Sequence, residues 1–208
     1  MRDLYYADNR DLVKWAVLVH IAHTHKLRSI IQVPYWRVGK QHHFMFGGIQ
    51  IPIQKAVWDF FRDIRQIVRL GECCDIGIEV IMEPFSHTNR RVYSNHISRH
   101  LEACDKRPLL LFLDPDTGLA PRSTSPEHTT PEEIKEVWSR LHPNEFLVLY
   151  QHAPRQYRPG WFTIPEEKLS RICDGAEVVV ARSDEIGRDV AFLCVQKPLQ
   201  NPENSMPN

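Results

Sequence analysis

Short apolar runs alternate along the chain with longer segments in which apolar residues recur every three or four positions. Such runs are typical of buried strands, and such recurrence is typical of amphipathic helices. The pattern predicts strands at residues 29–33, 76–82, 109–113, 146–150, 176–182 and 189–196, and helices at residues 12–21, 54–70, 89–104, 131–141 and 165–172. Alternating helices and strands favour an α/β fold with a doubly wound, mostly parallel, Rossmann-like sheet. The last two strands predict a closing antiparallel β-hairpin.

Turn residues refine this pattern. Residues 37–52 contain three glycines and two adjacent histidines, and we interpret them as a long loop. Gly71 follows the second helical pattern directly and is expected to end it. Pro131 followed by two glutamates is a typical helix start.

Length and composition narrow the class of protein. The 208 residues fit one domain, expected at 1–197, and residues 198–208, rich in Pro, Asn and Ser, are expected to be a disordered tail. Lys and Arg (26) balance Asp and Glu (26), so bulk positive charge for holding nucleic acid is absent, although a local basic patch is not excluded. Five scattered cysteines and the lack of a long apolar run favour a soluble, cytoplasmic protein without a membrane partner.

The strongest candidate site follows the strand at residues 109–113. Asp114, Asp116 and Thr117 come directly after five consecutive apolar residues. In an open α/β sheet the carboxyl ends of the strands form the ligand crevice. The two carboxylates could hold Mg²⁺ with phosphate oxygens, orient an amine or act as a general base. A turn in which each Asp caps nearby backbone N–H groups is the alternative.

Two other segments are expected near these acids. Tyr150, Gln151, His152 and Arg155 follow or end the next strand, so they should reach the same edge of the sheet. His152 could exchange protons near neutral pH, and Arg155 could clamp a phosphate or carboxylate. Asp11 and Lys14 lie one helical turn apart. They form either a surface ion pair or a pair that covers the cleft, with Lys14 meeting the acids.

The order of elements and the Asp-Pro sequence after a middle strand resemble the class I S-adenosylmethionine-dependent methyltransferases. More narrowly, Asp11 and Lys14 match the opening Gly-Asn-x-x-Asp-x-x-Lys-His of ribosomal RNA adenine-N6 methyltransferases, with Asp8 in place of Asn and Trp15 in place of His. Asp114-Pro115 matches the first half of their Asp-Pro-Pro-Tyr motif, whereas Asp116-Thr117 replaces Pro-Tyr.

The resemblance implies S-adenosylmethionine as cofactor and a nucleic acid or nucleotide as substrate. Of the candidate residues, Asp11, Lys14 and Asp114 match the family's motifs by position, and the others are chosen from the expected edge of the sheet. Together they predict catalytic Asp114, Asp116, His152 and Lys14, cofactor-binding Asp11, Gln32 and Tyr35, and substrate-binding Tyr150, Gln151, Arg155 and Thr117. Tyr35, Trp36 or Tyr150 would supply the aromatic face for a flipped adenine. The sequence departs from the family after the first strand, where residues 32–37 replace the glycine-rich cofactor turn.

Two other functions remain open. Asp114 and Asp116 could bind Mg²⁺ in a metal-dependent phosphoesterase or nuclease. This pattern resembles the Asp-x-Asp-Gly-Thr of haloacid dehalogenase-like phosphatases, but Thr117 and Gly118 are transposed. The missing glycine-rich turn also agrees with a binding or assembly module that uses no cofactor. The histidines show no ligand spacing, so no further metal site is predicted.

Overall fold

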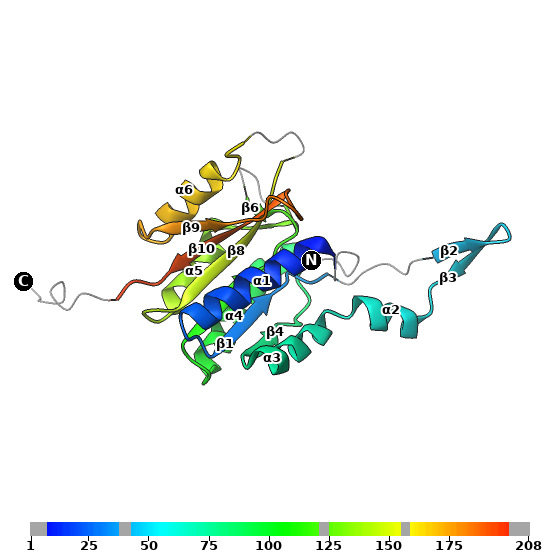
Figure 1. Cartoon of the computed structure of the whole chain (residues 1–208), viewed down its shortest axis with the longest axis horizontal. Coiled ribbons are helices and arrows are strands. Elements are labelled where there is room, and N and C mark those ends of the chain that lie inside the picture. The colour runs from blue at the N-terminus through cyan, green and yellow to red at the C-terminus, as the bar shows by residue number, and fades with distance from the viewer. Residues whose placement is uncertain (1–7, 38–42, 121–124, 155–158, 200–208) are drawn as a thin grey trace, which may run out of the picture.

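The structure is a computed structural model that describes residues 8–37, 43–120, 125–154 and 159–199. A six-stranded sheet runs through the middle of the molecule, with helices on both faces (Figure 1). Its strands lie in the order β4 (Gly77–Val80), β1 (Ser29–Val33), β5 (Leu109–Leu113), β8 (Phe146–His152), β10 (Val190–Gln196) and β9 (Val178–Ala181). This is the doubly wound α/β class that the alternating elements predicted.

The directions of the strands confirm the predicted mostly parallel sheet with a closing antiparallel hairpin. β4, β1, β5 and β8 are parallel, as expected of strands joined by crossover helices. β10 is antiparallel to both of its neighbours, β8 and β9. The closing hairpin therefore exists, and its second strand is inserted between β8 and β9 at one end of the sheet.

The run of apolar residues in β5 is explained by burial on both faces. Leu109, Leu111 and Leu113 join the core on one side of the sheet. Leu110 and Phe112 join the core on the other side. Successive side chains of a strand point to opposite faces, so a strand covered on both sides must be apolar throughout.

The helices divide between these two faces. The first core contains side chains of α4 (Arg90–Ala103), α5 (Pro131–Arg140) and α6 (Thr163–Ile172). The second contains side chains of α1 (Asn9–Thr24), with α3 (Val68–Cys74) packed at its margin. The side chain of Asp8 caps α1, and Thr130 and Glu133 form a capping box at the start of α5. These caps fix the starts of two helices that flank the carboxyl edge.

The expected long loop at residues 37–52 was wrong for its second half. A two-stranded hairpin, β2 (His43–Phe46) and β3 (Ile49–Pro52), occupies this part, while residues 38–42 lie outside the described ranges. Gly47 and Gly48 join the strands with φ of 57° and 81°. Two glycines in left-handed conformation are what a two-residue hairpin turn requires. Figure 1 shows this hairpin projecting from the body of the molecule.

The single helix expected at residues 54–70 was also wrong. The chain forms α2 (Lys55–Arg62), a 3-10 turn η2 (Ile64–Ile67) and α3. Asp63 interrupts the helix, because its backbone is extended and its side chain accepts a hydrogen bond from Arg65 N. Gly71 does not end the helix but lies buried inside α3, where a Cβ would come within 2.5 Å of Ile76 O. Asp75, at φ 52°, ends it instead.

Smaller elements complete the chain. The structure adds a short 3-10 turn η3 (His87–Asn89) and a parallel pair, β6 (Gly118–Leu119) and β7 (His128–Thr129). β8 extends to His152, beyond the predicted end at residue 150, because its pairing with β10 continues to Val190. Residues 200–208 of the expected tail lie outside the described ranges, and the domain limits stay a prediction. Among the described residues, no helix combines the length and the apolar character needed to cross a membrane.

Candidate functional site

The candidate site lies where the chain reverses its direction across the sheet. From β1 the chain continues to β4 on one side, and then crosses to β5 on the other side of β1. The carboxyl ends of β1 and β5 therefore form a topological switch point, the usual ligand position in open α/β sheets. Gln32 lies at this end of β1, and Asp114 follows β5. Asp114 N donates to Val33 O at 2.9 Å, which ties the two strand ends together.

A buried polar network joins α1 to this edge. Lys14 Nζ lies 2.9 Å from Asp114 Oδ2 and 2.5 Å from Asp11 Oδ1. Gln32 Nε2 donates to the same Asp114 Oδ2 at 2.8 Å. The four side chains belong to residues that are 1–7% exposed. Of the two arrangements left open by the sequence, the structure has the one in which Lys14 meets the acids.

The ammonium group of Lys14 is held as a cation. Burial alone would lower its pKa, but the nearby carboxylates of Asp114 and Asp11 outweigh this and raise it. Its Nζ also lies 5.7 Å from the ring centroid of Phe112 and 5.6 Å from that of Tyr150. Burial, followed by the charge of Asp114, raises the pKa of Tyr150, so this hydroxyl stays protonated. The trio of Lys14, Asp11 and Asp114 has two carboxylates against one ammonium.

Gln32 has one unused polar atom in this network. Its Nε2 faces a carboxylate, so the amide orientation follows from chemistry, since the reverse would bring two oxygens together. Its Oε1 is buried and has no hydrogen-bond partner among the described residues. An unsatisfied buried acceptor costs about 1–3 kcal/mol, which makes it a natural contact for a ligand donor.

The turn after Asp114 is fixed from the neighbouring strand. Gln151 Nε2 donates to Thr117 O, and Gln151 Oε1 accepts from Leu119 N, both at 3.0 Å. Gly118 has φ of 107°, and a Cβ there would lie 2.4 Å from Gln151 Oε1. Thr117 Oγ1 donates to Glu127 O at 2.8 Å. Gln151 and Thr117, expected to bind substrate, are in this structure engaged in holding the turn.

Asp116 forms an ion pair with Arg37, at the start of the segment after β1. Each acid of the Asp-x-Asp pattern therefore faces a cationic side chain, Lys14 for Asp114 and Arg37 for Asp116. A Mg²⁺ ion would have to displace both. Within the described ranges, no group of three or more His, Cys, Asp or Glu side chains is arranged to hold a metal ion.

His152 belongs to a second cluster. Its Nε2 lies 3.2 Å from Asp189 Oδ2, and its Nδ1 lies 2.8 Å from Ala153 O. Arg10 holds the same carboxylate through two contacts, at 3.1 and 2.5 Å. The hydrogen bond from Arg10 is the main reason why the pKa of Asp189 is lowered. The ring of Tyr150 connects this cluster with the Lys14 network, because its centroid lies 6.5 Å from that of the His152 ring and 5.6 Å from Lys14 Nζ. Arg155 lies outside the described residues.

Tyr35 turns away from the carboxyl edge. Its backbone is left-handed, with φ of 48°. Its ring packs against Phe85 and Tyr93 in the core beneath α4 and α5, and its residue is 1% exposed. Its hydroxyl lies 2.7 Å from Thr129 Oγ1. Burial raises the pKa of the Tyr35 hydroxyl well above its ordinary value. The structure therefore puts its ring inside the core, and the predicted stacking role would need a different conformation.

Sequence reasoning missed several polar residues around this edge. Arg90 donates to both carboxylate oxygens of Glu133 and to the carbonyls of Ser125 and His128, which fixes the segment before α5. Asp189 was not singled out either. No local signal could have found its partner, because the ion pair with Arg10 joins residues 179 positions apart.

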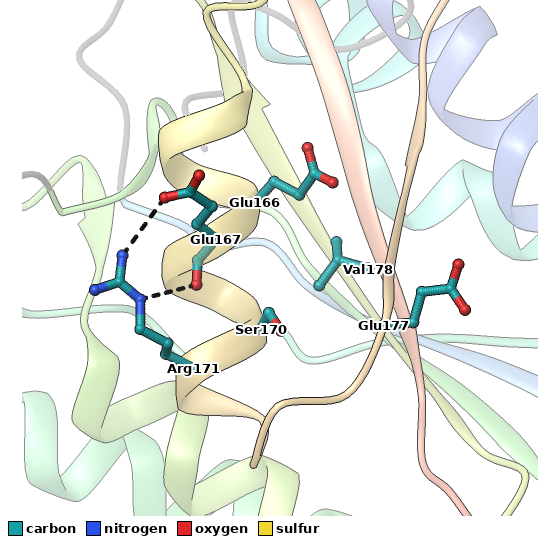
Figure 2. Close-up of a pocket in the computed structure, with 6 residues that line it drawn as sticks. All are labelled: Glu166, Glu167, Ser170, Arg171, Glu177 and Val178. Atoms are coloured by element: carbon teal, nitrogen blue, oxygen red, sulfur yellow. Dashed lines mark hydrogen bonds and ion pairs between the residues drawn. The ribbon is translucent and has the colours of Figure 1, made fainter.

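A surface hollow of about 490 Å³ lies elsewhere, between α6 and β9 (Figure 2). Glu166, Glu167, Ser170, Arg171, Glu177 and Val178 line it. Arg171 is turned toward Glu167 on its own helix, with Nη2 3.8 Å from the carboxylate. None of the predicted site residues lines this hollow, so it is separate from the switch point.

No family model matches the chain, and no curated protein matches it. Among solved structures, the chain is similar to the crystal structure of a protein described as a "putative methyltransferase" from Thermobifida fusca YX. The two are 11% identical with a TM-score of 0.49, and the match covers 92% of this chain and 81% of the other. A likeness of this size defines neither substrate nor activity.

Proposed function

We propose that this chain is a methyltransferase-like enzyme that acts on a nucleotide or a nucleic acid at the carboxyl ends of β1 and β5. The contact that carries the proposal is the one between Lys14 Nζ and Asp114 Oδ2, at 2.9 Å. Lys14 and Asp114 lie 100 positions apart. They belong to the two segments whose residues resemble the adenine methyltransferases, so their meeting at the switch point supports a shared site.

Asp114 is suited to orient an amino group of the substrate. Both described side-chain contacts to its carboxylate fall on Oδ2, so Oδ1 is the oxygen that a ligand donor would meet. Lys14 and Gln32 fix the carboxylate from two directions before any ligand binds. Such preorganisation lets a buried carboxylate recognise an amine without first losing a water shell.

Several features of this edge bear on the binding of S-adenosylmethionine. The unused Gln32 Oε1 can accept a hydrogen bond from a ligand, and the carboxylates of Asp11 and Asp114 belong to the same network. The turn after β1 reaches a left-handed conformation at Tyr35, whose ring lies in the core. These features fit the cofactor, with Gln32 and Asp11 as the residues that would hold it. When bound, S-adenosylmethionine supplies an electrophilic methyl group.

The chain's own residues have simpler roles in this proposal. Asp114 holds the substrate amine, Lys14 holds the Asp114 carboxylate in place, and Asp11 balances the charge of Lys14. Gln151 keeps the Asp-Pro-Asp-Thr-Gly turn in position through Thr117 and Leu119.

A second candidate is a binding module that uses no cofactor. The observation in its favour is that Pro34 and Tyr35 stand where the resembled family has glycines. The four network residues are also almost fully buried, which suits a network that only supports the fold. The same experiment separates the two functions.

The test is calorimetric titration of the full chain with S-adenosylmethionine, S-adenosylhomocysteine and Mg²⁺. Wild type is compared with Asp11→Asn, at a residue proposed to hold the cofactor, and with Asp184→Asn, a control whose exposed carboxylate pairs with Arg182 at the surface. We expect cofactor binding to weaken about 10-fold to 100-fold in Asp11→Asn, the worth of one charge-assisted hydrogen bond, and to stay unchanged in the control. Circular dichroism checks that each variant is folded.

Each other outcome contradicts the proposal. Binding of Mg²⁺ alone would favour a phosphoesterase or nuclease. The absence of measurable binding for all three probes would favour the binding module. Cofactor binding that is equal in all three proteins would put the site elsewhere. Transfer of a labelled methyl group to RNA, DNA or free nucleotides then identifies the substrate class.

A further inference from the structure

Tyr93 is a buried tyrosine that has no part in the proposed function so far. It lies on α4 in the first core and is 3% exposed. The centroid of its ring is 5.4 Å from that of Tyr35 and 5.1 Å from that of Phe85. Its hydroxyl is buried and has no hydrogen-bond partner among the described residues. A phenylalanine would fill the same space without burying an unsatisfied hydroxyl, so packing alone does not account for a tyrosine here.

Two further buried atoms without a hydrogen-bond partner in the described part of the chain lie around the same turn. They are Gln32 Oε1 and Arg37 Nε, and their residues stand on either side of Tyr35 in the sequence. Tyr93 packs against the ring of Tyr35. Native structures satisfy nearly all buried polar groups with protein, water or a ligand. Three such atoms around one turn at the switch point indicate that a polar ligand completes their hydrogen bonds.

Tyr93 reaches the carboxyl edge from the face of the sheet opposite α1. Lys14 extends from α1 beside the second core, whereas Tyr93 belongs to the first core. The turn that Tyr93 packs against is tied to Asp114, because Asp114 N donates to Val33 O two residues before Tyr35. Asp114 is therefore flanked by Lys14 on one face of the sheet and by Tyr93 on the other.

The hydroxyl of Tyr93 is a hydrogen-bond donor at neutral pH. Burial raises its pKa, and the charges of Glu133, Glu83 and Asp114 raise it further. The backbone of Tyr35 offsets a part of this rise, without forming a hydrogen bond of ordinary geometry. The hydroxyl thus keeps its hydrogen and lies within the field of the Asp114 carboxylate. A ligand at this edge would meet an acceptor on Asp114 and a donor on Tyr93.

We propose that Tyr93 is a specificity-determining residue, whose hydroxyl donates to the ring nitrogen next to the amine that Asp114 holds. This inference rests on the proposed function, in which Asp114 binds the substrate amine. An acceptor beside a donor matches an amino group beside an unprotonated ring nitrogen, which is the edge that adenine and cytosine present. Hypoxanthine and uracil carry a carbonyl and an N–H group in these places, so both hydrogen bonds would be lost.

The experiment measures the binding of single-stranded oligonucleotides of about eight residues to the full chain by fluorescence anisotropy, with S-adenosylhomocysteine present. Each oligonucleotide contains one kind of base: adenine, cytosine, hypoxanthine or uracil. We expect wild type to bind adenine about 10-fold more tightly than hypoxanthine, or cytosine about 10-fold more tightly than uracil. Tyr93→Phe should lose this preference, because the amino base then binds about 10-fold more weakly.

Ser98→Ala is the matched control, since it removes a satisfied hydroxyl from the same helix. Ser98 is 5% exposed, and its Oγ donates to Glu136 Oε1 at 2.9 Å. Its loss should lower the melting temperature by about 2–4 °C and leave the binding of every oligonucleotide unchanged. Tyr93→Phe should do the reverse, because it removes no hydrogen bond from the fold. Its melting temperature should equal or exceed that of wild type while its binding weakens.

The other outcomes separate this inference from the proposed function. A Tyr93→Phe variant that keeps the preference of wild type would overturn the inference and leave the proposed function standing. A wild type that binds all four oligonucleotides equally would do the same, and so would a Tyr93→Phe variant with a lowered melting temperature, which indicates a structural hydroxyl. A wild type that binds none of the oligonucleotides would contradict the proposed function and, with it, this inference.

Discussion

Replacing Lys14 with methionine tests the buried network most directly. The change keeps an unbranched side chain, one atom shorter than that of lysine, and removes its positive charge. Asp11 and Asp114, which are 7 and 2% exposed, then lie buried without the cation that compensates them. Breaking a buried ion pair by removing one partner costs about 3–5 kcal/mol. We expect Lys14→Met to lose that much free energy of unfolding, a large part of the total stability of a domain.

Urea unfolding followed by tryptophan fluorescence measures this loss, and five tryptophans provide the signal. Lys55→Met is the control, because Lys55 is largely exposed and pairs with Asp59 at the surface. Its effect should stay within about 0.5 kcal/mol. Adding Asp114→Asn to Lys14→Met should restore part of the loss, with a coupling of at least about 1 kcal/mol. A loss below about 1 kcal/mol in Lys14→Met would refute the reasoning.

Three further predictions concern other parts of the chain. Because the guanidinium of Arg10 lowers the pKa of Asp189, the ion pair of these two residues stabilises the fold above about pH 4, and this stabilisation is lost as the pH falls below that. Asp189→Asn should therefore flatten the acid side of a profile of stability against pH measured by thermal unfolding. An unchanged profile would contradict this. Gly118→Ala, at φ of 107°, should cost at least about 1 kcal/mol by urea unfolding, and an unaltered midpoint would exclude the strain. Burial raises the pKa of Cys173 to about 12, so a thiol reagent at pH 8 should label exposed Cys73 first and Cys173 only after unfolding; equal rates would count against it.

The parts of the fold that the sequence predicted well are those with a local signal. Five apolar residues in a row predicted a strand covered on both faces, and the two cores on either side of β5 confirm it. Placing Asp114 at the ligand edge followed from the same strand. The contact of Lys14 with Asp114 was one of two open alternatives, and the family resemblance favoured it.

The β2–β3 hairpin was missed although its signal was present. Gly47 and Gly48 stand between two short apolar segments, which is a recognised hairpin pattern. The hydrogen bond from Gln151 to Thr117 O had no such signal in the sequence. Its partners lie 34 positions apart, and an amide next to a strand end does not reveal what it binds. The pairing of Asp189 with Arg10 was hidden for the same reason.

The position of Tyr35 has a consequence for redesign. Thr129 Oγ1 donates to Glu133 Oε2, so the hydroxyl of Tyr35 must donate to Thr129. The turn after β1 is thereby linked by hydrogen bonds to the capping box that starts α5, so a change in the turn also affects the start of the helix. Replacing Tyr35 with glycine, to copy a glycine-rich turn, would leave a cavity beside Phe85 and a loose start to α5. A design that introduces a glycine-rich turn here would therefore first need new core side chains to fill the space of the Tyr35 ring.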